Sequence, residues 1–426
     1  MIPETDKTGG PRAILIASAG NLVEWYDFYV YSAFSLYFAD AFFPGDDPVA
    51  QMLAASGVFA LGFLMRPVGA YVFGQIGDRR GRRAALMLSV LLMCAGSALI
   101  AVLPTFAAIG MAAPTLLLVA RLLQGASLGG EYGSSATYLA EMAPPGRRGF
   151  FSSFQYVTMI AGQLLALGVL LFLQNIALDE EALRRWGWRI PFVIGGFLAL
   201  ATLWLRRDLS ETTSFAATQD DVRRGSLRAL LEHRRETATV VGLTLGGTVA
   251  FYVYTTWMQK FLKLSAGLSA TETTWVMAAS LVFALTLQPV YGALSDRIGR
   301  RPMLIAFGAL GAFCTAPLLF AIRETNNAAC ALALVCCGWL IVGLYTSINA
   351  VVKAELFPPA IRVTGVALPY ALTVSVFGGS AEYLALWFKS RQHEEWFFYY
   401  ASAAIFVSLL VYATMPETRD RSDLDR

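Results

Sequence analysis

The sequence predicts an all-α integral membrane protein whose twelve transmembrane helices form two pseudo-symmetric six-helix bundles. Three observations support this fold class. Of the 426 residues, 56% are hydrophobic and 15% are charged, whereas soluble domains carry roughly 25% charged residues. Apolar runs long enough to cross a bilayer recur along the whole chain. Two pairs of nearly identical loop segments indicate that the second half repeats the first.

Each expected helix is a run of about 20 mostly apolar residues, which spans about 30 Å of hydrocarbon at about 1.5 Å per residue. The first eleven residues are polar and carry no cleavable signal pattern, so we expect the first span to remain in the mature protein. Twelve such runs occur, at about 13–38, 52–75, 84–103, 114–140, 150–174, 188–206, 238–262, 273–294, 303–322, 328–352, 363–387 and 396–414.

The positive charges between the spans predict the orientation of the chain. With a cytoplasmic N-terminus, the inner loops hold seventeen arginines, whereas the outer loops hold seven basic residues, among them Lys260. Short cytoplasmic loops carry the excess of lysine and arginine, so both termini are expected in the cytoplasm. A nucleic-acid partner would need one contiguous basic patch. Here the arginines recur at every second loop, so no nucleic-acid partner is expected.

Two loop segments occur twice at nearly equal offsets. GQIGDRRGRR at Gly74–Arg83 returns as GALSDRIGRR at Gly292–Arg301, 218 residues later. AEMAPPGRR at Ala140–Arg148 returns as AELFPPAIR at Ala354–Arg362, 214 residues later. Two independent matches indicate a duplicated six-helix unit.

The duplication predicts the domain organisation. The stretch between the units is polar and charged, without an apolar run of 20 residues. We therefore expect an N-terminal six-helix bundle at 1–206, a cytoplasmic linker at 207–236 and a C-terminal six-helix bundle at 237–426. Two such units facing each other form a cavity near the bilayer midplane, the arrangement that transporters use for alternating access.

The G-x-x-x-D-R-x-G-R-R loops resemble the signature loop of the major facilitator superfamily. In that family the loop latches helices at the cytoplasmic gate and releases them as the two halves rock. Topological anchoring by positive charge is a second role, compatible with the first. The resemblance implies that the gate residues are Asp78, Arg79, Arg82, Asp296, Arg297 and Arg300.

Carboxylates inside the spans predict proton coupling. Glu24 and Asp27 lie within a turn of the bilayer centre, and their i, i+3 spacing places them on one helix face. Glu131 lies near the centre of the fourth span. Ionisable residues are expensive in hydrocarbon and mark a pathway or a relay. The two histidines, His233 and His393, fall in loops, so a relay within the spans must use carboxylates, and these three are the candidates.

Arginines inside the spans predict an anionic substrate. Arg121 begins an R-x-x-Q-G segment that resembles the fourth-helix motif of proton-coupled facilitators, and Arg66 lies in the second span. A guanidinium holds a carboxylate in bidentate fashion, so both are candidate substrate ligands. The alternative is a static salt bridge from Glu24 or Asp27 to either arginine that only fastens helices.

Neutral polar side chains complete the expected binding site. They could hydrogen-bond a keto oxygen and a second carboxylate, and aromatic packing is the alternative role for each tyrosine. These candidates are Tyr252, Tyr254, Gln259, Tyr345, Asn349, Gln155 and Gln163.

Nothing in the sequence supports enzyme chemistry. The G-A-S-L-G segment from Gly125 to Gly129 formally matches a hydrolase elbow, but an elbow needs a strand, a turn and a reachable histidine. These glycines also form a G-x-x-x-G that favours helix packing. No nucleotide-binding or metal-binding motif occurs, so no cofactor and no metal are expected. The five cysteines lie in apolar spans and are expected to be small buried hydrophobes.

The motifs GNLVEWYDFYVY, GFLMRPVG, DRRGRR, RLLQGASLGGEYG and WGWRIPF, in this order, resemble the metabolite:proton symporter branch of the major facilitator superfamily over about residues 13–415. Within the branch, GGEYGSSATYLAEMAPPGRRGFFSSFQYVT, YTTWMQKFL, YTSI and FGGSAEY are most similar to carriers of 2-oxoglutarate (α-ketoglutarate). The resemblance implies a symporter that brings this dicarboxylate and protons across the bacterial inner membrane, and we expect a monomer.

Other substrates remain open because relatives carry citrate, shikimate or betaines on the same framework. Two arginines in the first half suit an anion better than a zwitterion such as proline or betaine. The osmosensing betaine carriers of the branch have a long C-terminal extension with coiled-coil character, and we expect none here. A sensor that kept the fold without transport would be marked by an appended domain, which we do not expect here.

Overall fold

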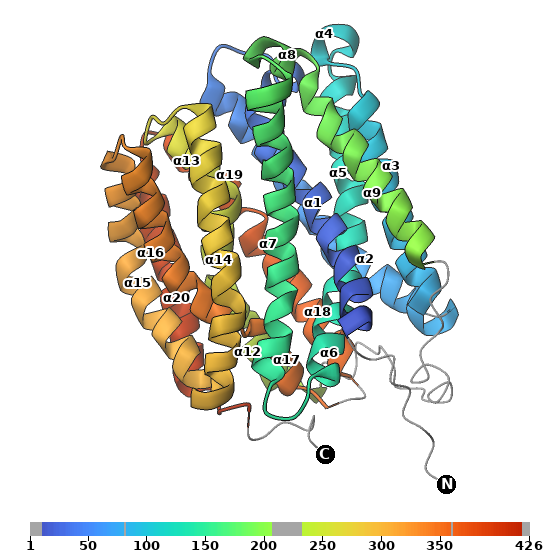
Figure 1. Cartoon of the computed structure of the whole chain (residues 1–426), viewed down its shortest axis with the longest axis vertical. Helices are drawn as coiled ribbons and strands as arrows, with labels where there is room; N and C mark the ends of the chain where they lie inside the picture. The colour runs from blue at the N-terminus through green and yellow to red at the C-terminus, as the bar shows by residue number, and fades with distance from the viewer. Residues whose placement is uncertain (1–10, 81, 207–231, 359–360, 420–426) are drawn as a thin grey trace.

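The computed structural model describes residues 11–80, 82–206, 232–358 and 361–419, and within these ranges the chain forms helices joined by turns. The long helices run side by side, and the start of the first one, α1 (Pro11–Phe42), lies at the same end of the molecule as the end of the last one, α20 (Glu394–Thr414) (Figure 1). We call this the terminal end and the opposite one the distal end. Ten of the described helices are long and apolar enough to cross a membrane. The first and third predicted spans, which are also helical, complete the set of twelve.

The first half of the chain supplies six spans. Short helices α4 (Phe106–Ile109), α8 (Glu180–Arg185) and η3 (Gly187–Arg189) lie in the connections between them. The spans are α1 (Pro11–Phe42), α2 (Pro48–Arg80), α3 (Arg82–Val102), α5 followed by α6 (Ala112–Gly129, Glu131–Met142), α7 with the π-helical turn η2 (Arg148–Phe172, Leu173–Ala177) and α9 (Ile190–Arg206).

The second half repeats this pattern. Its first and fifth spans are interrupted by π-helical turns, η4 and η5. In such turns the backbone departs locally from the hydrogen-bond pattern of the α-helix. The spans are α12, η4 and α13 (Arg234–Tyr252, Val253–Trp257, Met258–Leu264), α14 (Ala270–Ile298), α15 (Arg300–Glu324), α16 and α17 (Ala328–Thr346, Asn349–Glu355), α18, η5 and α19 (Arg362–Thr373, Val374–Gly378, Ala381–Ser390) and α20 (Glu394–Thr414).

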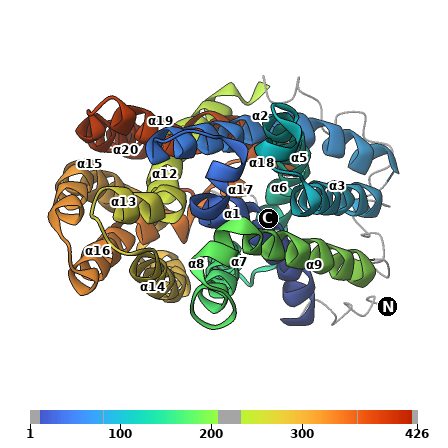
Figure 2. The same ribbon diagram turned by 90° about the horizontal axis from the view of Figure 1, so that it is seen from above.

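The two halves form two bundles that meet along two seams. Seen from above, α12–α16 and α20 lie on one side of the molecule and α3, α5 and α9 on the other, with α1 and α17 between them (Figure 2). Along one seam α7 packs against α14, and along the other α2 packs against α18 and α19. The predicted fold of two six-helix bundles is thus confirmed.

The outside of the bundles is apolar, as a lipid-facing surface must be. Large side chains such as Phe197, Trp204 and Phe313 are 68%, 60% and 72% exposed. The chain is therefore a multi-pass membrane protein. The expectation that the five cysteines are buried is wrong, because Cys330 and Cys337 are exposed on α16 and the other three are half-buried. A thiol is small and weakly polar, so it can face lipid at little cost.

Two glycines bring α5 into backbone contact with α2. A Cβ at Gly125 would lie 1.8 Å from the carbonyl oxygen of Gly62, and a Cβ at Gly129 would lie 2.0 Å from that of Arg66. Real Cβ atoms do not approach an oxygen so closely, so only glycine permits this crossing. The G-x-x-x-G therefore serves helix packing, and it fixes the stretch of α2 that carries Arg66.

Gly125→Ala is expected to destabilise the protein. The added methyl group would push α5 away from α2, and overpacking of this kind usually costs about 1–3 kcal/mol. The check is the thermal unfolding midpoint of the purified protein in detergent. Gly168→Ala in α7 is the matched control, because a Cβ there meets no atom within 4 Å. Equal midpoints for the two variants would contradict the packing argument.

Candidate functional site

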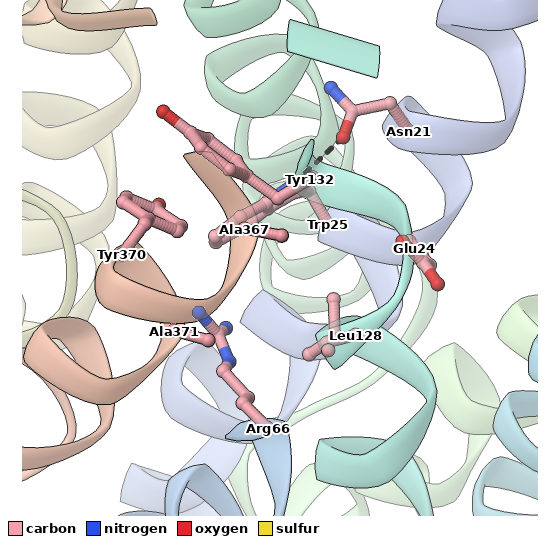
Figure 3. Close-up of a pocket in the computed structure, with 10 residues that line it drawn as sticks. Asn21, Glu24, Trp25, Arg66, Leu128, Tyr132, Ala367, Tyr370 and Ala371 are labelled. Atoms are coloured by element: carbon pink, nitrogen blue, oxygen red, sulfur yellow. Dashed lines mark hydrogen bonds between the residues drawn. The ribbon is translucent and has the colours of Figure 1, made fainter. Parts of the chain in front are cut away.

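A small hollow lies between the two bundles. The first bundle contributes its wall from α1, α2, α5 and α6, and the second bundle contributes α18. Figure 3 shows the side chains that surround it. The polar and aromatic ones are Asn21, Glu24, Trp25, Arg66, Tyr132 and Tyr370.

Arg66 is the cation of this hollow. Its side chain is 3% exposed, and its Nε and Nη2 atoms have no hydrogen-bond partner among the described residues. The guanidinium carbon lies 4.2 Å from the ring centre of Phe63, 4.9 Å from that of Phe28 and 5.3 Å from that of Trp25. Ring faces stabilise a desolvated guanidinium but do not satisfy its N–H groups. In Figure 3 the guanidinium points toward α18, so its free donors are available to an anion.

Glu24 lines the same hollow but is oriented differently. Its carboxylate accepts a hydrogen bond from the Ser127 hydroxyl at 3.3 Å. The single proton of this hydroxyl is shared with the backbone carbonyl of Ser89, which is closer at 2.7 Å and ties α5 to α3. In Figure 3 the carboxylate points away from the guanidinium of Arg66. An acid beside the hollow is positioned to exchange a proton with whatever fills it.

Asp27 belongs to a network inside the first bundle. It is 1% exposed, accepts a hydrogen bond from the hydroxyl of Ser97 in α3, and accepts another from Gln124 Nε2 at 2.7 Å. Gln124 in turn accepts from Arg121 Nη1 at 2.6 Å. The side-chain amide of Gln124 therefore links Asp27 to Arg121. These two residues form no direct ion pair in the described part of the chain. Protonation of Asp27 would therefore change the hydrogen bonding of Gln124 and, through it, that of Arg121.

Arg121, the first predicted substrate ligand, does not line the hollow. Its guanidinium carbon lies 4.5 Å from the ring centre of Tyr31, 5.1 Å from that of Phe59 and 5.3 Å from that of Phe28. The ring of Phe28 therefore lies near both Arg121 and Arg66. Glu131, the third predicted proton carrier, is buried at the first position of α6, just after α5 ends.

Of the neutral candidates, Gln163, Gln259 and Tyr252 contact the opposite bundle. Gln163 Nε2 donates to the Thr255 carbonyl of the π-helical turn η4 at 2.6 Å, and Gln259 Nε2 donates to the Ala33 carbonyl at 3.4 Å. The ring of Tyr252 packs on Phe63, with 5.3 Å between ring centres. These three residues therefore contribute to the contact between the two bundles, outside the lining of the hollow.

Asn349 also crosses to the first bundle, since its Oδ1 accepts from the Tyr132 hydroxyl at 3.1 Å. Gln155 accepts from the Ser135 hydroxyl at 3.0 Å, within the first bundle. Tyr254 packs against Trp339 and Tyr345 against Phe307, both inside the second bundle. For these two tyrosines the structure provides the aromatic packing that was the alternative role.

At the terminal end, the predicted gate residue Asp296 holds the start of α7. Its two carboxylate oxygens accept the backbone N–H groups of Gly149 at 2.8 Å and Phe150 at 2.9 Å. A helix N-terminus presents unpaired N–H groups and a positive dipole end, so a carboxylate is a favourable partner. Arg300 forms an ion pair with Asp296 at 2.8 Å and reaches Glu355 at 3.4 Å.

The remaining predicted gate residues are Arg297, Asp78, Arg79 and Arg82. Arg297 is exposed. The backbone places Asp78 and Arg79 at the end of α2 and Arg82 at the start of α3, and their side chains lie outside the described residues. The second repeated motif contributes a link of its own, because Arg362 Nη1 in one copy pairs with Glu141 in the other copy at 2.8 Å.

Toward the distal end, a buried ion pair corrects the predicted location of one basic residue. Lys260, expected in an outer loop, is fully buried in α13, and its Nζ lies 2.9 Å from Glu382 of α19. Serines of the first bundle complete this cluster. The Ser32 hydroxyl donates to Glu382 at 3.1 Å, and the Ser56 hydroxyl also donates to it. Through these serines the ion pair of the second bundle is joined to the first bundle, on the far side of the hollow from Asp296.

The family model of the Major Facilitator Superfamily matches residues 18–381 and 243–424 of the chain. The chain belongs to this superfamily. The alpha-ketoglutarate permease of Escherichia coli (strain K12) is 51% identical over 94% of this chain and 92% of its own length. The citrate-proton symporter of Klebsiella pneumoniae is 36% identical over 87% of this chain and 84% of its own. The proline/betaine transporter of E. coli (strain K12) is 33% identical over 96% and 84%.

Among solved structures, the major facilitator proton:xylose symporter XylE bound to 6-bromo-6-deoxy-D-glucose superposes with a TM-score of 0.80. The two sequences are 20% identical, and the match covers 97% of each chain. At this identity the likeness concerns the fold, and it agrees with the twelve spans expected from the sequence.

Proposed function

We propose that this facilitator is a proton-coupled symporter that imports a dicarboxylate, 2-oxoglutarate, by alternating access. The observation that carries the proposal is Arg66, a buried guanidinium with two unpartnered nitrogen atoms beside a hollow between the bundles. A carboxylate supplies the paired acceptors that such a group lacks. The similarity to the alpha-ketoglutarate permease supports the choice of substrate.

Alternating access requires that contacts between the bundles break at one end while they hold at the other. Asp296 links α14 to the start of α7 at the terminal end, and the ion pair of Lys260 with Glu382 joins the serines of α1 and α2 toward the distal end. We assign the two rocking units to residues 1–206 and 237–426, joined by a linker at 207–236. The terminal end is the cytoplasmic side of the bacterial inner membrane in this proposal.

Proton coupling in this scheme uses Asp27 and Glu24. Entry of a dianion into a cell at −100 mV is opposed by about 4.6 kcal/mol, twice the value for one charge, and two co-transported protons would cancel this term. Protonation of the buried acid removes a charge before the bundles rock. The proton gradient is the driving force, no cofactor takes part, and the substrate leaves unchanged.

Uptake by proteoliposomes tests the proposal. With an inward proton gradient, labelled 2-oxoglutarate should accumulate above its external concentration, and a protonophore should abolish this accumulation. Excess unlabelled 2-oxoglutarate should compete more strongly than succinate, shikimate or proline. Citrate is the second candidate because of the citrate-proton symporter relative. Stronger competition by citrate would replace the substrate, and accumulation without a proton gradient would overturn the mechanism.

A further inference from the structure

Lys353 is a buried cation without an acid partner in the second bundle. It lies in α17, its side chain has no exposed surface, and no carboxylate of the described residues lies within ion-pair distance of its Nζ atom. The Nζ atom donates to Asn349 Oδ1 at 2.8 Å and to the Tyr132 hydroxyl at 3.3 Å. It also lies 4.1 Å from the ring centre of Tyr370.

Three other buried basic residues of this protein do have an acid partner, whereas Lys353 shares the lack of one among the described residues with Arg66 and Arg121. Lys260 is paired with Glu382, Arg300 with Asp296, and Arg362 with Glu141. A charge removed from water without a counter-ion is costly, and neutral acceptors and ring faces offset only part of that cost. Intramembrane lysines of this kind are functional candidates by default.

The environment of Lys353 connects it to the hollow. Tyr132 of the first bundle and Tyr370 of the second are stacked, with ring centres 3.6 Å apart and planes 10° from parallel. Both rings line the hollow that holds Arg66, and Figure 3 shows them side by side above it. Lys353 touches both tyrosines. It therefore contacts a stacked pair that lines the hollow and contributes one ring from each bundle.

We propose that Lys353 is a specificity-determining residue that receives the second carboxylate of the substrate, while Arg66 holds the first. This inference rests on the proposed function. A carboxylate that displaces the Tyr132 hydroxyl would supply the missing counter-ion. It would also separate the stacked rings and connect the first bundle, through Arg66, to the second, through Lys353. A ligand drives a conformational change only through contacts that differ between the two states, and this bridge is such a contact.

The test compares two ligands that differ by one carboxylate. Binding of 2-oxoglutarate and of 2-oxopentanoate, which lacks the distal carboxylate, is measured by titration calorimetry on the purified full-length protein. The parent protein should prefer 2-oxoglutarate. Lys353→Met should weaken binding of 2-oxoglutarate by about tenfold or more, the size of a charge-assisted hydrogen bond, and leave that of 2-oxopentanoate nearly unchanged. Lys353→Arg should retain most of the preference.

Two further variants make the result interpretable. Lys263→Met removes a cation that makes no ion pair among the described residues, and it should preserve the parent ratio. Lys353→Gln replaces the methionine variant if the latter does not elute as a folded species from gel filtration. If Lys353→Met, or Lys353→Gln in its place, keeps the parent preference for 2-oxoglutarate, this inference is overturned and the proposed function stands. If the parent itself binds no 2-oxoglutarate, the proposed function fails and this inference fails with it.

Discussion

Asp27→Asn is expected to abolish uphill uptake of 2-oxoglutarate, with accumulation falling to the external concentration, while exchange of internal for external substrate continues. Asparagine has the same shape and still accepts the hydrogen bond from Ser97. It cannot bind or release a proton, so the step that couples the gradient to the substrate is lost. Exchange needs only that the loaded carrier rocks in both directions, and a permanently neutral side chain permits this.

The measurement is labelled uptake into proteoliposomes with and without a proton gradient, together with counterflow from preloaded vesicles. Glu24→Gln is tested in parallel, because Glu24 lines the hollow whereas Asp27 lies behind it. Ser97→Ala is the matched control, since it removes a hydrogen bond of the network but keeps the acid. Full uphill uptake by the Asp27→Asn variant would exclude this residue as the coupling acid.

The large features of the fold followed from the sequence because the bilayer imposes them. Span length, apolar composition and loop charge are local properties, and the glycines at the α2–α5 crossing occur as a local motif. The two repeated loop motifs also made the duplication visible. These observations predicted the superfamily, which the comparisons confirmed.

Side-chain directions within the site did not follow from sequence spacing. The i, i+3 relation predicted one shared face for Glu24 and Asp27. In the structure Glu24 lines the hollow, whereas Asp27 is enclosed by α3 and α5. Adjacent positions on a helix face separate when different neighbours pack against each, and those neighbours are set by tertiary structure. The same reason explains why Arg121, expected at the substrate, lies against Gln124 instead.

Non-local charge pairs were also invisible in the sequence. Lys260 stands at the end of an apolar run, where a basic residue usually marks a loop. Its partner Glu382 comes from another span, and nothing in the local pattern of either residue indicates the other. Lys353 stands at the end of the tenth apolar run, where the local pattern does not indicate its neighbours. Its lack of an acid partner became evident only once its surroundings were known.

Lys260→Met is expected to destabilise the folded protein severely, by about 3–5 kcal/mol, because it leaves the carboxylate of Glu382 buried without a cation. Glu382→Gln alone should also be harmful, since it leaves the ammonium of Lys260 buried without an anion. Combining the two substitutions removes both charges and keeps an acceptor for the serine hydroxyls. The double variant should therefore recover most of the lost stability, because a buried ion pair replaced as a whole is often nearly neutral.

The measurement is the thermal unfolding midpoint, in one detergent, of the parent protein, the two single variants and the double variant. A large favourable interaction between the two substitutions is the expected result, because the two charges lie 2.9 Å apart and are both fully desolvated. Additive losses would mean that each side chain acts through its own packing. If the double variant is stable, its transport rate separates two roles for the pair. Unchanged uptake would assign it to stability alone, whereas slower uptake in a well-folded carrier would place it among the contacts that hold the distal end closed.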